Sequence, residues 1–367
     1  MRTYRFKLYK SKRNRKLHKQ INTACLIYNH CIALHKRYYK LFGKSLNLYQ
    51  LQKHITKLKK ISKFAYMKEL GSQAVQDIAE RIDRAYKLFF RNLKHKIRTA
   101  PPSFKKINKY KSFTLKQTGW KLDEASNSIT IGKQRYRYAK SREIEGKIKT
   151  ITVKRDALGD IYLYFVCETS ENEVLARTGK NVGFDFGLKT FLTASDGKDI
   201  KAPLFFRQNA NAIKMASRNL SRKAKGSNNR KKAKIALARL HKKVANQRDN
   251  FHWQTASKLV GEYVLICIED LNLKAMQKRF GRKISDLGFA DFVSKLKYKA
   301  HRAGVSVIEV GRFFPSSQLC SDCGYRNTET KNLTIRKWTC PKCGNIHNRD
   351  RNASINIERE GSRIFFA

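Results

Sequence analysis

Three acidic residues far apart in the chain have the side chains best suited to carry out chemistry: Asp185, Glu269 and Asp350. Carboxylates, together with water and phosphate oxygens, are the ligands that Mg²⁺ prefers in proteins. Two such ions can stabilise both the attacking and the leaving oxygen when a phosphodiester is hydrolysed. The three acids therefore predict a divalent-metal site for phosphodiester hydrolysis, with all three as catalytic residues and magnesium ligands.

The segments around the acids predict the elements that position them. Asp185 lies in a predicted strand hairpin over residues 181–195, Glu269 closes a strand that contains the apolar run YVLICI, and Asp350 opens a predicted helix. Two strands and a helix that bring three acids together are the plan of an RNase H-like site. Taken singly, the acids also have structural interpretations, as a turn acid, a strand-end acid and a helix cap respectively.

Four cysteines form two closely spaced pairs with sixteen residues between them. They are Cys320, Cys323, Cys340 and Cys343. This spacing predicts a tetrahedral zinc site, and four thiolates leave no ligand position open for catalysis, so the zinc is expected to be structural. Zinc would supply folding energy that so short a segment cannot obtain from burial alone. His347 is an alternative ligand, but its position outside the regular spacing favours a contact beside the ligands or with nucleic acid.

The charge balance indicates the class of partner. The chain has 367 residues with 80 Lys and Arg against 28 Asp and Glu, a net charge of +52, which favours binding to a polyanion. The longest apolar run has the length of a strand, and the N-terminal segment lacks the apolar core of a signal peptide, so we expect neither membrane association nor secretion. The four remaining cysteines occupy apolar positions and are expected to be reduced, which favours a reducing, cytoplasmic location.

One segment concentrates the positive charge. Residues 218–243 hold eleven Lys and Arg and no acid. Charge runs are commonly solvated helix faces, but so many unbalanced cations would repel one another without a bound polyanion. We therefore expect this segment to contact nucleic-acid phosphates.

Periodicity predicts helices in the first part of the chain and strands in the second. Apolar residues from Leu17 to His35 define a helix that Gly43 ends, and a second helix runs from Ser72, an N-cap candidate, to Leu93. Residues 128–132, 147–155 and 160–168 read as strands. The length suggests two or three domains.

Several long motifs resemble the TnpB family, the RuvC-type proteins of insertion sequences that are related to type V CRISPR effectors. They are GFDFGLKTFLTASDG, IEDLNLKAM, ISDLGFADFVSKLKYKA, FPSSQLCSDCG and WTCPKCGNIHNRDRNASINI, with LIYNH and RIDRAYKLFFRN in the first half. The resemblance covers nearly the whole length. One departure is Asn348, at a position where the family commonly has an acid, so we place the catalytic role on Asp350.

The resemblance implies a multidomain α+β and α/β protein in which a helical recognition region and a β-barrel wedge domain precede an RNase H-like (RuvC) nuclease with a zinc-ribbon insert. The implied domains are a wedge of residues 1–12 and 108–178, a helical region of 13–107, a nuclease of 179–316 and 346–367, and an insert of 317–345. The implied activity is RNA-guided, Mg²⁺-dependent cleavage of double-stranded DNA beside a short transposon-adjacent motif. The implied partners are a guide RNA from the transposon end, bound by one protein chain, and the target DNA.

The resemblance also suggests which residues contact nucleic acid. The start of the second helix and the matching wedge strand would read the DNA motif through Ser72, Gln73, Gln76, Thr114 and Gln117, since Gln can pair with adenine; alternatively Ser72 caps the helix and the glutamines are solvated. Phosphate contacts are expected from Arg84, Lys87, Arg91, Arg218, Arg222, Lys223, Arg230, Lys231 and Lys232. Tyr110, Phe113 and Trp120 are either base-stacking residues or ordinary core.

Three other functions are compatible with these residues. The first is a nuclease-inactive, RNA-guided DNA-binding regulator, although the chain keeps all three acids. The second is a transposase-type strand-transfer protein, in which the acids would activate a 3′-hydroxyl instead of water. The third is a zinc-ribbon RNA-binding protein whose carboxylates are structural.

Overall fold

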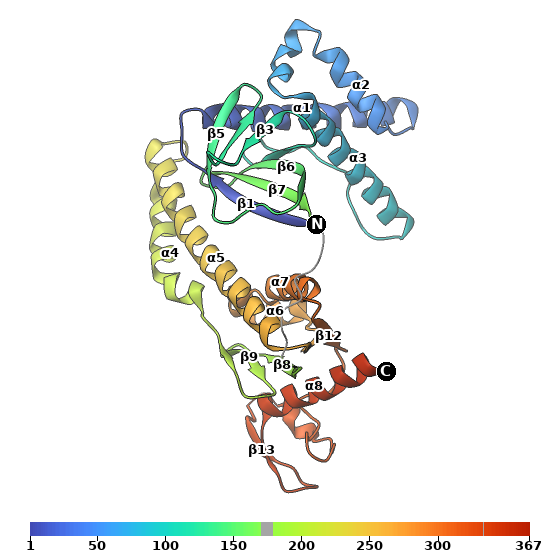
Figure 1. Cartoon of the computed structure of the whole chain (residues 1–367), viewed down its shortest axis with the longest axis vertical. Coiled ribbons are helices and arrows are strands. Elements are labelled where there is room, and N and C mark those ends of the chain that lie inside the picture. Colours follow the sequence, from blue (N-terminus) through green and yellow to red (C-terminus); the bar gives the residue numbers. More distant parts are fainter. Residues whose placement is uncertain (170–178, 333) are drawn as a thin grey trace. The chain divides into compact units, whose positions relative to one another are not determined.

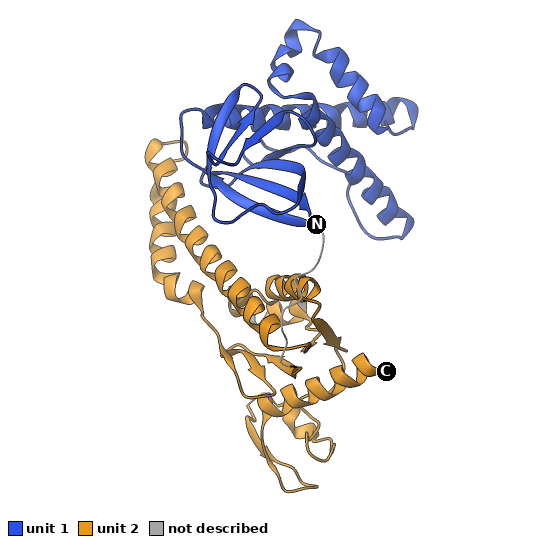
Figure 2. Cartoon of the chain, in the orientation of Figure 1, with its two compact units in different colours: residues 1–170 blue, residues 171–367 orange. Residues whose placement is uncertain are grey.

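A computed structural model describes residues 1–169, 179–332 and 334–367 and divides the chain into two compact units, Met1–Ser170 and Glu171–Ala367 (Figures 1 and 2). Each unit has its own large hydrophobic core. In the described residues, no helix is long and apolar enough to cross a membrane.

The first unit contains a curved, barrel-like antiparallel sheet (Figure 1). Within residues 1–169 its strand order is β2-β6-β7-β1-β5-β4-β3. The strands are β1 (Arg2–Leu8), β2 (Ser112–Leu115), β3 (Trp120–Asp123), β4 (Ser128–Ile131), β5 (Gln134–Ala139), β6 (Lys147–Arg155) and β7 (Ile161–Glu168). Because β1 pairs with both β5 and β7, the first residues of the chain complete the sheet, as the implied wedge domain requires. The last part of that implied domain, residues 170–178, lies outside the described residues.

The helices of the first unit lie between β1 and β2 in the sequence. They are α1 (Asn14–Phe42), α2 (Leu48–Leu58), the 3-10 helix η1 (Ser62–Glu69) and α3 (Ser72–Lys94). Gly43 ends α1 in the left-handed conformation, as predicted. Gly71, not Ser72, is the N-cap of α3, because Ser72 is already the first helical residue. The helix α2 was not predicted, although Asn47 and Gln50 form a capping box at its start.

The aromatic residues considered for base stacking belong to the core of this unit. Tyr110 is 8% exposed and Phe113 is 1% exposed. Trp120 is partly buried against the same core, and its indole N–H donates to the carbonyl of Lys116 at 2.8 Å. The structural interpretation therefore holds for all three.

The second unit is built on a mixed sheet with the order β10-β9-β8-β11-β12 in the described residues. Its strands are β8 (Asn181–Phe186), β9 (Thr190–Ala194), β10 (Ile200–Lys201), β11 (Leu265–Glu269) and β12 (Ser306–Val310). β11 runs parallel to both β8 and β12, whereas β8 and β9 form the predicted antiparallel hairpin. The helices are α4 (Phe205–Arg222), α5 (Asn228–Glu262), α6 (Leu273–Leu287), α7 (Phe289–Ala303) and α8 (Arg349–Phe366).

The cysteine-rich segment lies between β12 and α8. It contains the short 3-10 helix η2 (Thr328–Lys331) and the hairpin of β13 (Lys337–Thr339) and β14 (Ile346–Asn348). Its own small cluster of buried residues is centred on Cys320, Trp338 and Cys340. A core this small supports the expectation that a bound metal stabilises the segment.

Candidate active site and metal centre

Two of the three predicted acids lie at the same end of neighbouring parallel strands. Phe184 of β8 stands beside Ile268 of β11, so the next residue on each strand, Asp185 and Glu269, comes to the same level of the sheet. Neighbouring strands are separated by about 4.8 Å. The parallel pairing therefore brings together two carboxylates that are 84 positions apart in the sequence.

The helix α8 carries the third acid and lies directly on these strands. A Cβ atom at Gly183 would stand 2.2 Å from the carbonyl oxygen of Ser354, and one at Gly361 would stand 2.3 Å from Sγ of Cys267. Only glycine permits this approach at both positions. The two contacts hold α8 against β8 and β11 with Asp350 in its first turn.

Asn348 begins this helix. Its side-chain oxygen accepts hydrogen bonds from the backbone N–H groups of Asp350 at 3.1 Å and Arg351 at 3.2 Å. Asn348 is therefore the N-cap, which is the structural role considered above for Asp350. The Asp350 carboxylate remains available for another role.

The electrostatics indicate that Glu269 and Asp350 act on Asp185. Burial, together with the nearby Glu269 and Asp350 carboxylates, raises the pKa of Asp185 to about 8. Burial also raises the pKa of Glu269, while the Ser316 hydroxyl, 3.5 Å from Oε1, favours its ionised form. A buried carboxylate beside two like charges is a site that a divalent cation would stabilise. The donor set thus fits Mg²⁺.

Two arginines that the sequence analysis did not single out also belong to this site. Nη1 of Arg336, from the cysteine-rich segment, donates to both carboxylate oxygens of Asp350 at 3.0 and 3.1 Å. Arg349 is 8% exposed, and its Nε has no hydrogen-bond partner among the described residues. Arg349 is adjacent to Asp350 in the sequence, but nothing local could have identified Arg336, since its position depends on the fold of the insert.

The structure brings the acids into one region without gathering their oxygens tightly. In the parts of the chain described, the groups of three or more candidate ligands within 4.8 Å of one another both lie in the cysteine-rich segment. A single cation held by all three acids would therefore require a rearrangement, in which Asp350 exchanges at least part of its contact with Arg336.

The four cysteines meet as predicted. Their sulfur atoms all lie within 4.8 Å of one another, and Sγ–Sγ distances are 3.7 Å for Cys320–Cys343 and 3.6 Å for Cys323–Cys340. Tetrahedral zinc with Zn–S bonds of about 2.3 Å places its sulfur ligands about 3.8 Å apart. The geometry therefore fits a zinc ion.

His347 lies beside these ligands. Its Nε2 atom is 3.1 Å from Sγ of Cys320, and its ring packs at a tilt against Trp338, with the ring centroids 4.8 Å apart. With Asp322 and Cys320 it also forms a second group of candidate ligands. A neutral imidazole can donate its N–H to a thiolate from this position, as expected for a contact beside the ligands.

Two of the predicted motif-reading residues, Ser72 and Gln73 at the start of α3, line a cavity of about 690 Å³ in the first unit. Thr118 and Gly119, of the turn after β2, line it as well, whereas Gln76, Thr114 and Gln117 are not among its lining residues. Oε1 of Gln73 is buried and has no hydrogen-bond partner within the described residues. Lys16, Lys68 and Lys133 outnumber Glu69 in the lining, so its charge is positive.

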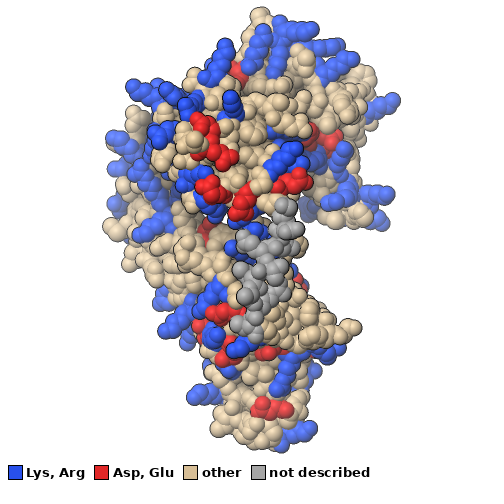
Figure 3. All heavy atoms as spheres, in the orientation of Figure 1, with Lys and Arg blue, Asp and Glu red and all other residues tan. Residues whose placement is uncertain are grey.

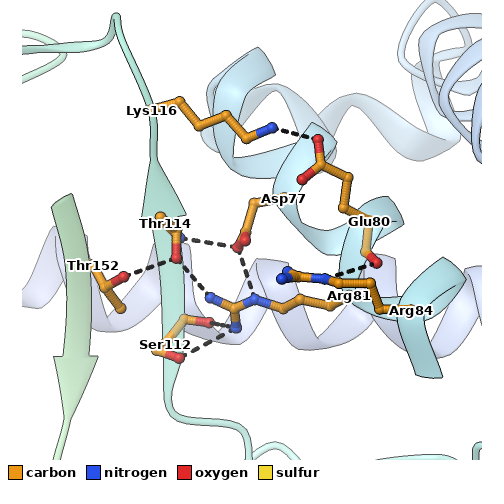
Figure 4. Close-up of polar contacts among 8 residues, drawn as sticks. All are labelled: Asp77, Glu80, Arg81, Arg84, Ser112, Thr114, Lys116 and Thr152. Carbon is orange, nitrogen blue, oxygen red and sulfur yellow. Dashed lines mark hydrogen bonds and ion pairs between the residues drawn. The ribbon is translucent and has the colours of Figure 1, made fainter. Parts of the chain in front are cut away.

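Thr114, predicted for the same role, makes hydrogen bonds within the first unit (Figure 4). Its hydroxyl accepts from the Arg81 guanidinium at 2.8 Å and lies 2.9 Å from the hydroxyl of Thr152. Its backbone N–H donates to Asp77, which pairs with Arg81 at 2.8 Å. This network joins α3 to the sheet. Gln76 is partly buried and Gln117 is exposed.

Most of the predicted phosphate-binding cations are exposed, and Figure 3 shows Lys and Arg over much of the face in view. Those exposed are Arg84, Lys87, Arg91, Arg218, Arg222, Lys223, Lys231 and Lys232. Arg230 is different: it is only partly exposed, and its Nη1 donates to the carbonyls of Leu220 at 2.9 Å and Lys223 at 2.7 Å. The Arg230 guanidinium therefore caps the end of α4.

Two family models match the second half of the chain. The OrfB_IS605 model, described as "Probable transposase", matches residues 164–279, and the "Cas12f1-like, TNB domain" model matches residues 289–357. The first match contains Asp185 and Glu269, and the second contains the four cysteines and Asp350.

Solved structures agree with this fold. A Cas12f1 chain from a cryo-EM structure of its complex with sgRNA and target DNA superposes with a TM-score of 0.58 at 14% identity, over 95% of this chain and 83% of that one. The mini-RNA-guided endonuclease Cas_phi3 gives a TM-score of 0.56 at 10% identity, over 98% of this chain and 92% of that one. At these identities the similarity concerns the fold alone.

Curated relatives extend over nearly the whole chain. A Streptomyces pristinaespiralis protein named "Putative RNA-guided DNA endonuclease" is 30% identical over 92% of this chain and 83% of its own length. The Escherichia coli K12 protein InsQ, with the same description, is 28% identical over 93% of this chain and 87% of its own. A "TnpB-like protein" of Acanthamoeba polyphaga mimivirus is 26% identical over 59% of this chain and 44% of its own. With its motifs, its fold and this extent of similarity, the chain belongs to the TnpB family.

Proposed function

We propose that this protein is an RNA-guided, Mg²⁺-dependent DNA endonuclease encoded by an insertion sequence. The observation that carries the proposal is the meeting of Asp185, Glu269 and Asp350 from β8, β11 and α8, with the pKa of Asp185 raised by burial and by the other two carboxylates. The names of the relatives and of the solved structures, which include an sgRNA and target DNA, support the same function.

The second unit would be the nuclease. In its sheet β9 pairs antiparallel with β10 and β8, and β11 pairs parallel with β8 and β12. This order is consistent with an RNase H-like (RuvC) sheet. Residues 179–316 and 346–367 would form this domain, and residues 317–345 would form a zinc-binding insert that contacts the target nucleic acid.

The three acids would hold one or two Mg²⁺ ions. When bound, these ions activate water and stabilise the leaving oxygen of the scissile phosphodiester. Glu269 is oriented by the Ser316 hydroxyl at 3.5 Å, and Asp350 is fixed by the first turn of α8. Ionisation of Asp185, which burial opposes, would accompany binding of the cations.

The first unit would recognise the guide RNA and the DNA motif. Residues 13–107 would form the helical recognition region, and residues 1–12 with 108–178 the wedge. Ser72, Gln73, Gln76 and Gln117 would contact the DNA motif, Ser72 and Gln73 from the cavity lining, and Thr114 would support them through its contacts with Arg81 and Asp77. The exposed cations of α3, α4 and α5 would contact phosphates of RNA or of the heteroduplex. One chain would act with one guide RNA in the cytoplasm.

The first experiment is to sequence the RNA that copurifies with the expressed protein and to supply a DNA target that matches its variable end. We expect cleavage of that target in Mg²⁺ and no cleavage of an unmatched one. Glu269→Gln is expected to reduce the cleavage rate by at least a thousandfold, with RNA binding within a few-fold of wild type, since the amide no longer holds the metal.

Asp270→Asn is the matched control. Asp270 is the next residue, but its carboxylate pairs with Arg312 at 2.8 Å. This variant should cut within about threefold of wild type, since an exposed ion pair contributes about 0–1 kcal/mol. Cleavage that survives both Glu269→Gln and Asp185→Ala would refute the metal site. Guide-dependent binding without cleavage by the wild type would favour the regulator instead.

A further inference from the structure

Three side chains of α8 reach back to the backbone of the first cysteine pair. Oδ1 of Asn352 accepts from the backbone N–H of Ser321 at 2.8 Å, and its Nδ2 donates to the carbonyl of Leu319 at 2.6 Å. Nδ2 of Asn356 donates to the carbonyls of Ser316 at 2.8 Å and Leu319 at 2.7 Å. The Arg359 guanidinium donates to the carbonyl of Ser321. These contacts surround Cys320 on both sides.

The two asparagines, here called the amide clamp, are buried. Asn352 is 1% exposed and Asn356 is 6% exposed, and Ser321 opposite them is 3% exposed. Loss of either asparagine would leave buried backbone groups of Ser316, Leu319 or Ser321 without these hydrogen bonds, which is destabilising. The amide clamp therefore fixes the segment 316–321 on the same helix that carries Asp350, two residues before Asn352.

A second route joins the cysteines to the start of α8. His347 contacts Cys320 at 3.1 Å, and the next residue, Asn348, caps α8. The backbone N–H of Arg349 donates to the carbonyl of Arg336 at 2.9 Å, so the residue that immediately precedes β13 also holds the first turn. Both ends of the cysteine-rich segment thus meet at the turn that presents Asp350.

We propose that the amide clamp of Asn352 and Asn356 makes the zinc module a positioning device for Asp350, beyond any contact of the module with nucleic acid. With zinc bound, the four cysteines would be fixed, Cys320 would fix segment 316–321, and the clamp would transmit that position to the first turn of α8. The clamp residues are positioning residues, since they act through Asp350. The metal-binding part of this inference rests on the proposed function, whereas the mechanical link between zinc and α8 does not.

The test uses the full chain, freed of RNA. It compares wild type with two clamp variants, one control variant and the reference variant Asp185→Ala. Asn352→Ala and Asn356→Ala remove the amide clamp and leave all four thiolates in place. Asn345→Ala is the matched control. Asn345 is exposed, and its side-chain amide donates to Asp322, within the zinc module, at 2.6 Å. Zinc content, Mn²⁺ affinity by electron paramagnetic resonance and hydrogen exchange of residues 349–353 are measured. The Mn²⁺ signal that Asp185→Ala removes defines the acidic site.

We expect both clamp variants to retain zinc, to bind Mn²⁺ at the acidic site at least tenfold more weakly, and to lose exchange protection at residues 349–353. Asn345→Ala should match wild type in all three measurements. Removing zinc from the wild type by dialysis against a chelator should reproduce the loss of protection, and returning zinc should restore it.

Unchanged protection of residues 349–353 after zinc removal or in both clamp variants would overturn the proposal, whether or not a variant also loses zinc. Unchanged Mn²⁺ affinity in clamp variants that have lost protection would also overturn it. If wild type and Asp185→Ala bind Mn²⁺ alike, the proposed metal centre fails, while the exchange measurement still decides the link between zinc and α8.

Discussion

At the scale of a residue, the Asp350 carboxylate is held by Arg336 of the cysteine-rich segment. Arg336 occupies both oxygens that a cation would use. Arg336→Ala should therefore tighten Mn²⁺ binding about two- to fivefold, the equivalent of about 0.5–1 kcal/mol for a partly exposed ion pair. The Mg²⁺ affinity of Arg336→Lys should lie between those of Arg336→Ala and wild type. Equal or weaker binding by Arg336→Ala would mean that the arginine does not compete with the cation.

The raised pKa of Asp185 predicts how the stability of the protein depends on pH. Its folded-state pKa of about 8 lies above the ordinary aspartate pKa of 3.8, so between pH 3.8 and 8 the folded protein holds a proton that the unfolded chain has lost. This contribution to stability is complete below pH 3.8 and is lost as the pH rises through 8. In EDTA, Asp185→Asn, which stays neutral, should become more stable than wild type by about 1–3 kcal/mol at pH 8, with almost no difference near pH 4. Thermal unfolding at several pH values measures this difference, and a constant difference across the range would contradict it.

At the scale of an element, the seat of α8 depends on Gly361. A Cβ there would stand 2.3 Å from Sγ and 2.6 Å from Cβ of Cys267, on the strand that ends at Glu269. Gly361→Ala should destabilise the protein by about 1–3 kcal/mol, because the helix must move or the strand must yield. Cleavage should fall more than stability accounts for, since Asp350 moves with the helix.

Gly261→Ala is the control for this change. Gly261 also lies in a helix, α5, but a Cβ there meets nothing within 4 Å. We expect it to be neutral or stabilising by up to about 1 kcal/mol, because alanine favours the helix. Denaturant unfolding and cleavage rates compare the two variants. Similar behaviour of both would show that the close approach at Gly361 does not position α8.

At the scale of the whole molecule, the net charge of +52 predicts binding that depends strongly on salt. The triple variant Arg218→Ala, Arg222→Ala and Lys223→Ala should bind guide RNA more weakly at every salt concentration. If all three contact phosphates, the slope of log affinity against log salt should fall by about 2–3. An unchanged slope would show that these cations form a solvated face.

Arg230→Ala separates charge from structure in the same helical pair. Because Arg230 caps α4 through the Leu220 and Lys223 carbonyls, its loss should lower thermal stability and leave the salt slope nearly unchanged. Replacement of the exposed Lys231 by Ala should leave thermal stability nearly unchanged and lower the slope by about 0.7–0.9. These outcomes are measured by thermal unfolding and by RNA binding at several salt concentrations.

Much of this protein was predictable from short stretches of sequence. The cysteine pairs, the strand β6 over residues 147–155, the end of α1 at Gly43 and the extent of α3 all depend on residues within a few positions of one another. Turn residues, helix caps and alternation act through local backbone preferences, which the sequence states directly. Assignment of Ser72 as the N-cap was wrong by one residue, because the choice between neighbouring caps depends on how the preceding turn enters the helix.

The sequence by itself determined which residues have the chemistry: three separated acids, four cysteines and a large excess of cations. Only the tertiary structure decided which contacts hold them in place: Arg230 closes α4, Arg336 holds Asp350, and Asn352 with Asn356 joins the zinc module to α8. The physical reason is the range of the interactions. A hydrogen bond between side chains and backbone that are 33 or 40 positions apart exists only after the intervening chain has folded, and no local preference records it.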